Sequence, residues 1–209
     1  MDFKYVTDMT HLFSDDPNAE VPAELLKFRD YLGHVVSSAT VTNEVEFLSA
    51  IPCRKKPNRK PCPGFVKVMR QDSPETYIYW HCPTCGDGGR IVKWQGCTYD
   101  KAEFEPHPKT DTEPYPPVEV KISRDEMNAL LDGSIYDPDS ERIIYAARPS
   151  KTAVLFRGSY SDMDNFEGFL ASDANHEENK KRQRLLEAVH AKVSDAVQKV
   201  YEENDLGSY

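Results

Sequence analysis

Apolar side chains change their spacing along the first hundred residues. After a polar, acidic lead-in over residues 1–20, apolar positions between Leu25 and Val36 recur at i, i+3, i+4 and i+7, and Pro22 suits the first turn of a helix. This spacing predicts an amphipathic helix over residues 22–38. The chain then alternates apolar and polar side chains in four short stretches, which are predicted strands: residues 41–51, 64–70, 77–80 and 90–94.

Prolines are concentrated in residues 102–117, and this composition predicts a linker between two parts of the chain. Beyond the linker, residues 118–122 are a predicted strand. Ser123 and Glu126 then have the spacing of a capping box, which predicts a helix that ends near Asp132. Two more strands are predicted, at residues 143–147 and 153–156.

The last third of the chain is predicted to be helical. Apolar residues recur every three or four positions from Leu185 to Val200, which predicts a long helix over about residues 172–203. Its apolar stripe should pack on the strands or on the helix at 22–38. Residues 118–209 therefore form a predicted small β-α-β-β layer packed with a long C-terminal helix, and the fold class is α+β.

Composition and the N-terminal sequence predict neither a membrane-spanning nor a secreted protein. The chain has 209 residues, of which 39% are hydrophobic and 29% charged. No apolar run approaches the ~20 residues of a membrane-spanning helix. The N-terminus lacks the basic start and apolar core of a secretory signal. These features predict a cytoplasmic protein.

Cysteine spacing gives the strongest chemical signal in the chain. Four of the five cysteines form two pairs between residues 53 and 85, and in a reducing compartment such pairs favour metal ligation over disulfides. Cys97 is left over and is expected to be a half-buried free thiol. The four predicted ligands are Cys53, Cys62, Cys82 and Cys85.

These four thiols predict one structural zinc ion. Zinc prefers four tetrahedral thiolate or imidazole ligands, and the short C-x-x-C spacing of Cys82 and Cys85 lets both sulfurs face one point. With four protein ligands no position remains for water, so the metal would be structural and not catalytic. Reduced structural thiols are the alternative, and His81 and His107 are substitute ligands. Short strands with cysteines at their ends predict a zinc ribbon within residues 21–101.

Charge is distributed unevenly along the chain, whose net charge is −9. Residues 51–101 contain ten basic and four acidic side chains, whereas residues 1–50 contain three basic and nine acidic ones. A basic region of this kind can bind a polyanion even in an acidic protein. It could equally dock on the acidic parts of the same chain.

Basic and aromatic residues around the cysteines predict a nucleic-acid contact. Cations would neutralise phosphates, and the rings of Tyr77, Tyr79, Trp80 and Trp94 on the nearby strands would stack on bases. Two alternatives remain open, because the cations can offset the thiolate charge and the tryptophans can form the small core. The candidate contact residues are Arg54, Lys55, Lys56, Arg59, Lys60, Lys67, Arg70 and Trp94.

A second polar group occurs near the C-terminus. Asp173 and His176 are three residues apart and so are neighbours on a helix face. The favoured interpretation is a polar network that ties the long helix to Arg182 or Arg184. A di-metal site would need a second such pair, which the sequence lacks. An acid-base role for His176 or Glu177 is the remaining alternative.

Several motifs of this sequence are similar to those of a bacterial group of uncharacterised proteins. The chain resembles this group in a C-R-x-x-P-x-R-x-P-C-P-G loop at Cys53–Gly64, a W-x-C-P-x-C-G-D-x-G knuckle at Trp80–Gly89 and a W-x-G at Trp94–Gly96. The resemblance extends to Gly168–His176 and implies a zinc-ribbon element within a larger architecture. It implies no activity. Cys97 departs from the pattern, where a threonine is expected.

Three functions are therefore considered. The first is a zinc-binding cytosolic module that associates with nucleic acid or regulates through binding. The second is a protein-interaction adaptor, or an oligomeric structural protein, that uses the C-terminal helix and the α+β layer. The third, an enzyme that uses Asp173 and His176, is the least favoured because no catalytic motif accompanies them.

Overall fold

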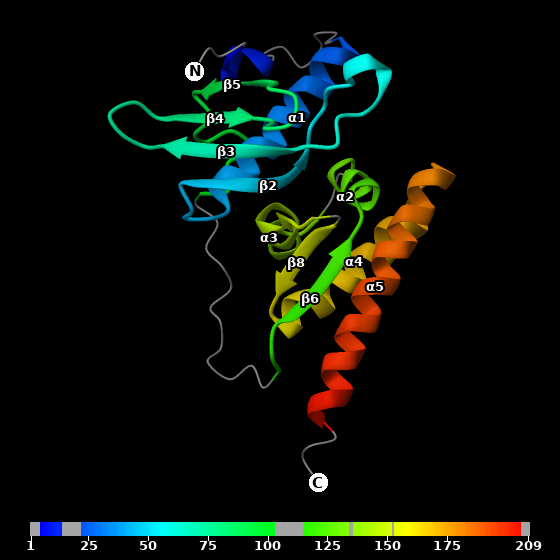
Figure 1. The fold of residues 1–209 in the computed structure, drawn as a ribbon. Coiled ribbons are helices and arrows are strands. Elements are labelled where there is room, and N and C mark those ends of the chain that lie inside the picture. Colours follow the sequence, from blue (N-terminus) through cyan, green and yellow to red (C-terminus); the bar gives the residue numbers. More distant parts are fainter. Residues whose placement is uncertain (1–4, 14–21, 103–114, 134–135, 152, 206–209) are drawn as a thin grey trace. The chain divides into compact units, whose positions relative to one another are not determined.

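The structure is a computed structural model that describes residues 5–13, 22–102, 115–133, 136–151 and 153–205. The chain divides into two compact units, residues 1–104 and 105–209 (Figure 1). Most of the predicted linker at 102–117 and much of the predicted lead-in at 1–20 lie outside the described residues, as does His107. No described helix has the length and apolar character needed to cross a bilayer.

The first unit is a five-stranded sheet with one long helix on one face (Figure 1). The strand order is β1-β5-β4-β3-β2, with β2 to β5 antiparallel and β1 added in parallel to β5. Its elements, together with the 3-10 helices η1 and η2, are β1 (Val6–Asp8), η1 (Met9–Leu12), α1 (Ala23–Thr40), β2 (Glu46–Pro52), η2 (Pro57–Arg59), β3 (Phe65–Gln71), β4 (Tyr77–His81) and β5 (Gly88–Val92).

Alternation along the strands decides which face α1 covers. The even-numbered residues Val66, Val68, Ile78 and Trp80 are buried, and α1 packs against β2, β3 and β4. The odd-numbered residues of β3 and β4 are only partly buried, so no described helix of this unit covers the opposite face. The helix predicted at 22–38 and the predicted hairpin are confirmed.

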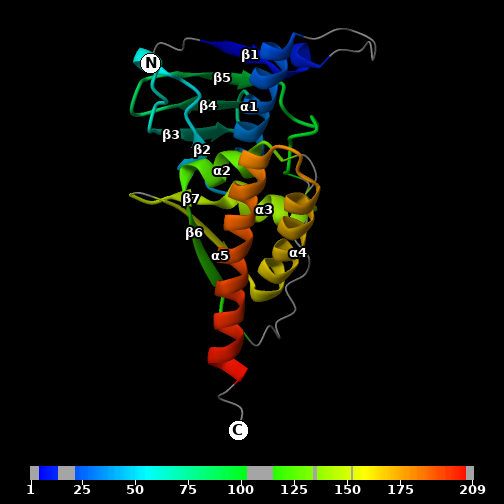
Figure 2. The same cartoon turned by 90° about the vertical axis from the view of Figure 1, so that its right-hand side faces the viewer.

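The second unit is a three-stranded antiparallel sheet with helices, in the order β6-β8-β7. Helix α5 runs along β6 and also packs on α2 and α4 (Figure 2). This arrangement confirms the α+β class and the long C-terminal helix. The elements are β6 (Val118–Ile122), α2 (Arg124–Leu131), α3 (Pro138–Ala146), β7 (Arg148–Pro149), β8 (Val154–Gly158), α4 (Tyr160–His176) and α5 (Lys180–Asp205).

Two sequence predictions in this unit need correction. The predicted strand at 143–147 is wrong, because most of it forms the end of α3, whose first turn is capped by the Asp137 carboxylate at the Ser140 N–H, 2.9 Å away. The predicted helix at 172–203 is interrupted after His176. Asn179 starts α5 there by accepting hydrogen bonds from two backbone N–H groups, those of Lys181 and Arg182.

Candidate metal centre

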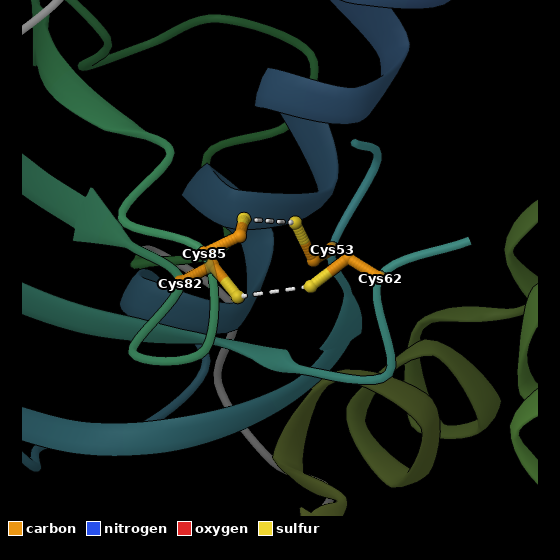
Figure 3. A group of neighbouring side chains, drawn as sticks. All are labelled: Cys53, Cys62, Cys82 and Cys85. Atoms are coloured by element: carbon orange, nitrogen blue, oxygen red, sulfur yellow. Dashed lines mark hydrogen bonds between the residues drawn. The ribbon is translucent and has the colours of Figure 1, made fainter. Parts of the chain in front are cut away.

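Two loops at the same end of the first sheet carry the four cysteines. Cys53 directly follows β2 and Cys62 lies three residues before β3, whereas Cys82 and Cys85 lie between β4 and β5. In a series of antiparallel strands, every second connection lies at the same end of the sheet, so the β2–β3 and β4–β5 loops lie together. The four side chains converge there from the two loops (Figure 3).

The sulfur atoms have the separation that one metal ion requires. All four lie within 4.8 Å of one another, with 3.5 Å between the Sγ atoms of Cys53 and Cys85 and 3.7 Å between those of Cys62 and Cys82. A tetrahedral zinc site with Zn–S bonds of about 2.3 Å places its sulfurs about 3.8 Å apart. The donor set and its spacing therefore fit one tetrahedral ion, and all five cysteines of the chain are free thiols.

Backbone geometry holds each loop in the shape that brings its thiols inward. In the β4–β5 loop the Cys82 N–H donates to the Asp87 carbonyl at 2.7 Å, and Gly86 turns the chain with a φ of +70° that favours glycine. Gly64 permits the close approach of the two loops. A Cβ at Gly64 would lie 2.5 Å from the Cys82 sulfur and from the Thr84 hydroxyl.

Burial affects the ionisation of the thiols. Cys53, Cys62 and Cys82 are buried and Cys85 is half-buried, and burial raises the pKa of Cys53 and of Cys62. Burial also opposes ionisation of Cys85, but the Asp87 N–H and the neighbouring thiols together lower its pKa. Ionised together, the four thiols would need a compensating positive charge, which a divalent ion bound among them would supply.

Asp87 is a functional candidate that the sequence analysis did not single out. Its carboxylate is 1% exposed and lies 3.3 Å from Nε of Arg54 and 3.5 Å from Nζ of Lys55. Because Asp87 belongs to the β4–β5 loop and both cations belong to the β2–β3 loop, these ion pairs join the two cysteine loops. The signal was present in the sequence, as an acid two residues after Cys85.

Aromatic rings surround the Arg54 guanidinium on several sides. Its central carbon lies 4.5 Å from the ring centroid of Phe28, and three more rings lie within 5.8 Å. Arg54 is therefore a packed cation whose charge is matched by Asp87 and by ring faces. The other three rings are those of Tyr5, Tyr31 and Trp80.

Other candidate nucleic-acid residues are also engaged within the first unit. Lys67 pairs with Glu46 across β2 and β3. Arg70 donates to the carbonyls of Ala39 and Thr42 at 2.9 and 3.2 Å, which anchors the end of α1 to β3. Trp94 is 4% exposed and offers no stacking face to solvent.

Three cations of the β2–β3 loop remain exposed. Lys56, Arg59 and Lys60 extend from the loop around η2, and among the described residues their side chains have no ionic or hydrogen-bonded partner. Asn58 and Arg59 have φ values of +53° and +63°, in the left-handed region that non-glycine residues rarely adopt. The loop therefore has a conformation that costs energy and directs three cations outward.

Tyrosines lie on the face of the first sheet that α1 does not cover. The rings of Tyr77 and Tyr79 are 4.4 Å apart between centroids, and the Arg90 guanidinium lies 4.2 Å from the centroid of Tyr77. All three side chains are partly exposed. Arg90 also pairs with the exposed Glu75 at 2.8 Å, so the positive charge of this face is partly balanced.

The second predicted polar group divides into two separate sites. Asp173 accepts hydrogen bonds from Arg182 at 2.7 Å and from the Tyr136 hydroxyl at 3.0 Å. Arg182 also contacts Glu177 and donates to the Ala129 carbonyl at 2.9 Å, so these contacts join α4 and α2 to the start of α5. His176 is exposed, and its Nδ1 lies 2.7 Å from the Ser172 carbonyl of its own helix.

Histidine does not join the metal centre among the described residues. The only group of potential metal ligands in that part of the chain consists of the four cysteines, without His81. Cys97 is half-buried outside this group, and burial raises the pKa of its thiol.

No family model, curated protein or solved structure matches the chain. The geometry of the four thiols thus carries the assignment of a candidate metal site.

Proposed function

We propose that the protein is a zinc-binding module whose metal holds a basic loop in place for nucleic acid. The observation that carries the proposal is the group of four thiols within 4.8 Å of one another, at the separations of a tetrahedral site. Sulfur-only ligation favours zinc among the common cellular divalent ions, and all four positions are taken by protein. The proposed role of the ion is therefore structural.

The proposed zinc ion substitutes for a hydrophobic core at the open end of the first sheet. It would join the end of β2 to the start of β5 through two short loops, which is the arrangement of a zinc ribbon, here extended by β1 and α1. Reduced thiols at this site suit a reducing compartment, so we place the protein in the cytosol.

Nucleic acid is the proposed partner because the exposed cations are grouped on one loop. Lys56, Arg59 and Lys60 would contact phosphates, while Tyr77 and Tyr79 on the open sheet face would stack on unpaired bases. The paired cations Arg54 and Lys55 would support the loop and not contact the ligand. A single strand is favoured over a duplex because stacking needs accessible base faces.

The adaptor hypothesis receives less support. The apolar stripe of α5 is buried within the second unit, where it packs on β6, α2 and α4, and is not available to a partner helix. The enzyme hypothesis is weaker still, since Asp173 and His176 have different partners and are not arranged as a catalytic pair. The buried stripe residues are Leu186, Val189, Val193 and Val197.

Metal analysis tests the zinc site. Freshly purified protein should contain about one zinc per chain, and chelation should unfold the first unit, because metal binding and folding are coupled in such sites. Tryptophan fluorescence reports this unit alone, since Trp80 and Trp94 both belong to it and are the only tryptophans. A zinc content near zero in reduced protein would refute the proposal.

Salt dependence tests the nucleic-acid contact. Each phosphate contact on a single strand contributes about −0.7 to the slope of log affinity against log salt. Contacts by the three exposed cations alone predict a slope near −2, whereas contacts by all seven basic candidates of the sequence predict about −5. Replacing Lys56, Arg59 and Lys60 by Glu should abolish binding to an oligothymidylate. The control changes the exposed Lys180, Lys181 and Arg184 to Glu, which alters the net charge equally in the second unit. Equal loss in both variants would show that only net charge matters.

A further inference from the structure

The four thiols of the metal centre differ in their access to solvent. Cys53, Cys62 and Cys82 are buried, whereas Cys85 is half-buried at the rim of the site. Small oxidants reach an accessible thiolate before a buried one, because oxidation follows exposure as well as thiolate character. Cys85 is thus the position at which a reactive molecule from solvent first meets the centre.

Two close sulfur-sulfur contacts connect the two loops. The Cys85 sulfur lies 3.5 Å from that of Cys53, and the Cys62 sulfur lies 3.7 Å from that of Cys82. Both contacts connect the β2–β3 loop to the β4–β5 loop (Figure 3). A sulfur-sulfur bond of about 2.05 Å would need a movement of only about 1.5 Å in either pair.

We propose that Cys85 is a modification site for hydroperoxides, and that its oxidation forms a Cys53–Cys85 disulfide which releases the metal. The proposal rests on the metal site of the proposed function and assigns a different chemical property to the same thiols. It selects one of the three ways in which four cysteines can pair. It also assigns an order, in which Cys85 reacts first and Cys53 second.

The reaction balances with one hydroperoxide as the oxidant. The Cys85 thiolate attacks the O–O bond of hydrogen peroxide, so that an S–O bond forms, hydroxide leaves and the sulfur is oxidised to a sulfenic acid. The Cys53 thiolate then attacks that sulfur, an S–S bond forms and a second hydroxide leaves. Two thiolates and one peroxide thus give one disulfide and two hydroxides, and the peroxide supplies the two-electron oxidation.

Loss of these two ligands leaves only Cys62 and Cys82 for the ion, and a structural zinc site needs four. The first disulfide should therefore release the metal completely. Because the new bond connects the same two loops as the ion does, the end of the sheet should remain joined after oxidation. Chelation of the reduced protein removes this connection, so oxidation and chelation should have different effects on the fold.

The test uses the full chain with Cys97→Ser, which removes the thiol outside the centre. Zinc content is measured first, and hydrogen peroxide is then added. Released zinc is followed with a chromogenic chelator, remaining thiols are counted, and disulfides are mapped by tandem mass spectrometry. Fragmentation between Cys82 and Cys85 is required, because no basic residue separates them for trypsin. A sulfenic-acid probe added at early times identifies the first oxidised residue.

We expect one zinc released for each pair of thiols lost, a Cys53–Cys85 disulfide as the first product, and early probe labelling at Cys85. Cys85→Ser should not release zinc under conditions that empty the parent protein. If that variant binds no metal, the disulfide map of the parent still decides. A first disulfide between Cys82 and Cys85 or between Cys53 and Cys62 would overturn the inference.

The same experiment separates this inference from the metal proposal. Absence of zinc before oxidation contradicts the proposed function, whereas a wrong disulfide map contradicts only the redox inference. The disulfide map is read in either case. Unchanged thiols and retained zinc after peroxide treatment would also refute the redox inference.

Discussion

The ion pair between Arg54 and Asp87 should be the main connection between the cysteine loops other than the proposed zinc ion. Asp87→Asn keeps the shape of the side chain and removes its charge, and Arg54→Met keeps an apolar side chain of similar length. The two atoms of the pair, Nε of Arg54 and Oδ2 of Asp87, are 3.3 Å apart, and the carboxylate is almost completely buried. Either change leaves the opposite charge without its main partner.

The expected loss of stability is large for one side chain. Removing one partner of a fully buried pair costs about 3 to 5 kcal/mol, because the other charge stays buried and uncompensated. Arg54 is 28% exposed, so water partly compensates it after Asp87→Asn, and we expect about 2 kcal/mol for that variant. Arg54→Met leaves the buried carboxylate with Lys55 alone, and we expect about 3 kcal/mol.

A double-mutant cycle in urea measures this interaction. Tryptophan fluorescence follows the first unit, and the free energy of unfolding is determined for the parent, both single variants and the double variant, all saturated with zinc. Coupling of about 1 to 3 kcal/mol is expected. The exposed pair of Lys67 and Glu46 is the control, and its cycle should show no measurable coupling. If the loss of stability in the double variant equals the sum of the losses in the two single variants, the ion pair does not connect the loops.

Two further changes test packing and charge elsewhere. Gly33→Ala should destabilise the first unit in urea by about 1 to 3 kcal/mol, because the new Cβ would lie 2.5 Å from the Tyr99 ring. Gly168→Ala lies on open helix surface and should stabilise the second unit. Equal effects of the two variants would disprove a steric clash at Gly33. Burial opposes ionisation of Glu126, but Lys192 at 2.7 Å and the Ser123 N–H and hydroxyl lower the pKa of its carboxyl. The stability that the ionised carboxylate contributes is therefore complete above the pKa of the unfolded state and is lost as pH falls through the pKa of the folded state. Glu126→Gln should therefore weaken the second unit at pH 7, by circular dichroism, and converge with the parent in acid.

The candidate metal ligands could be predicted from the sequence because their signal is local. A C-x-x-C knuckle needs only two intervening residues to bring two sulfurs to one point, and the same applies to the capping box at Ser123, which the structure confirms. The second pair, Cys53 and Cys62, is separated by eight residues, and its position depends on the pairing of β3 with β2 and β4. Spacing indicated that pair, but only the sheet brings it to the knuckle.

Short apolar runs were the weakest basis for prediction. Residues 143–147 are apolar enough for a buried strand, and periodicity does not separate such a run from the buried face of a helix. The decisive signals precede the run, where Asp137 caps the helix and Pro138 occupies its first turn. In the same way Asn179 marks the start of α5 within a charged stretch that offers no apolar pattern.

The charge of the β2–β3 loop shows why a count of basic residues overstates a binding surface. Of the seven cations between Cys53 and Asp72, four contact acidic side chains: Arg54 and Lys55 at Asp87, Lys67 at Glu46 and Arg70 at Asp72. A sequence reports their signs but not their partners, and two of the three acids, Asp87 and Glu46, come from another loop and another strand. A cation that is already paired with a carboxylate contributes little when it meets a phosphate. The affinity for nucleic acid should therefore depend on the three exposed cations of the loop, and the slope of log affinity against log salt measures how many cations contact phosphate.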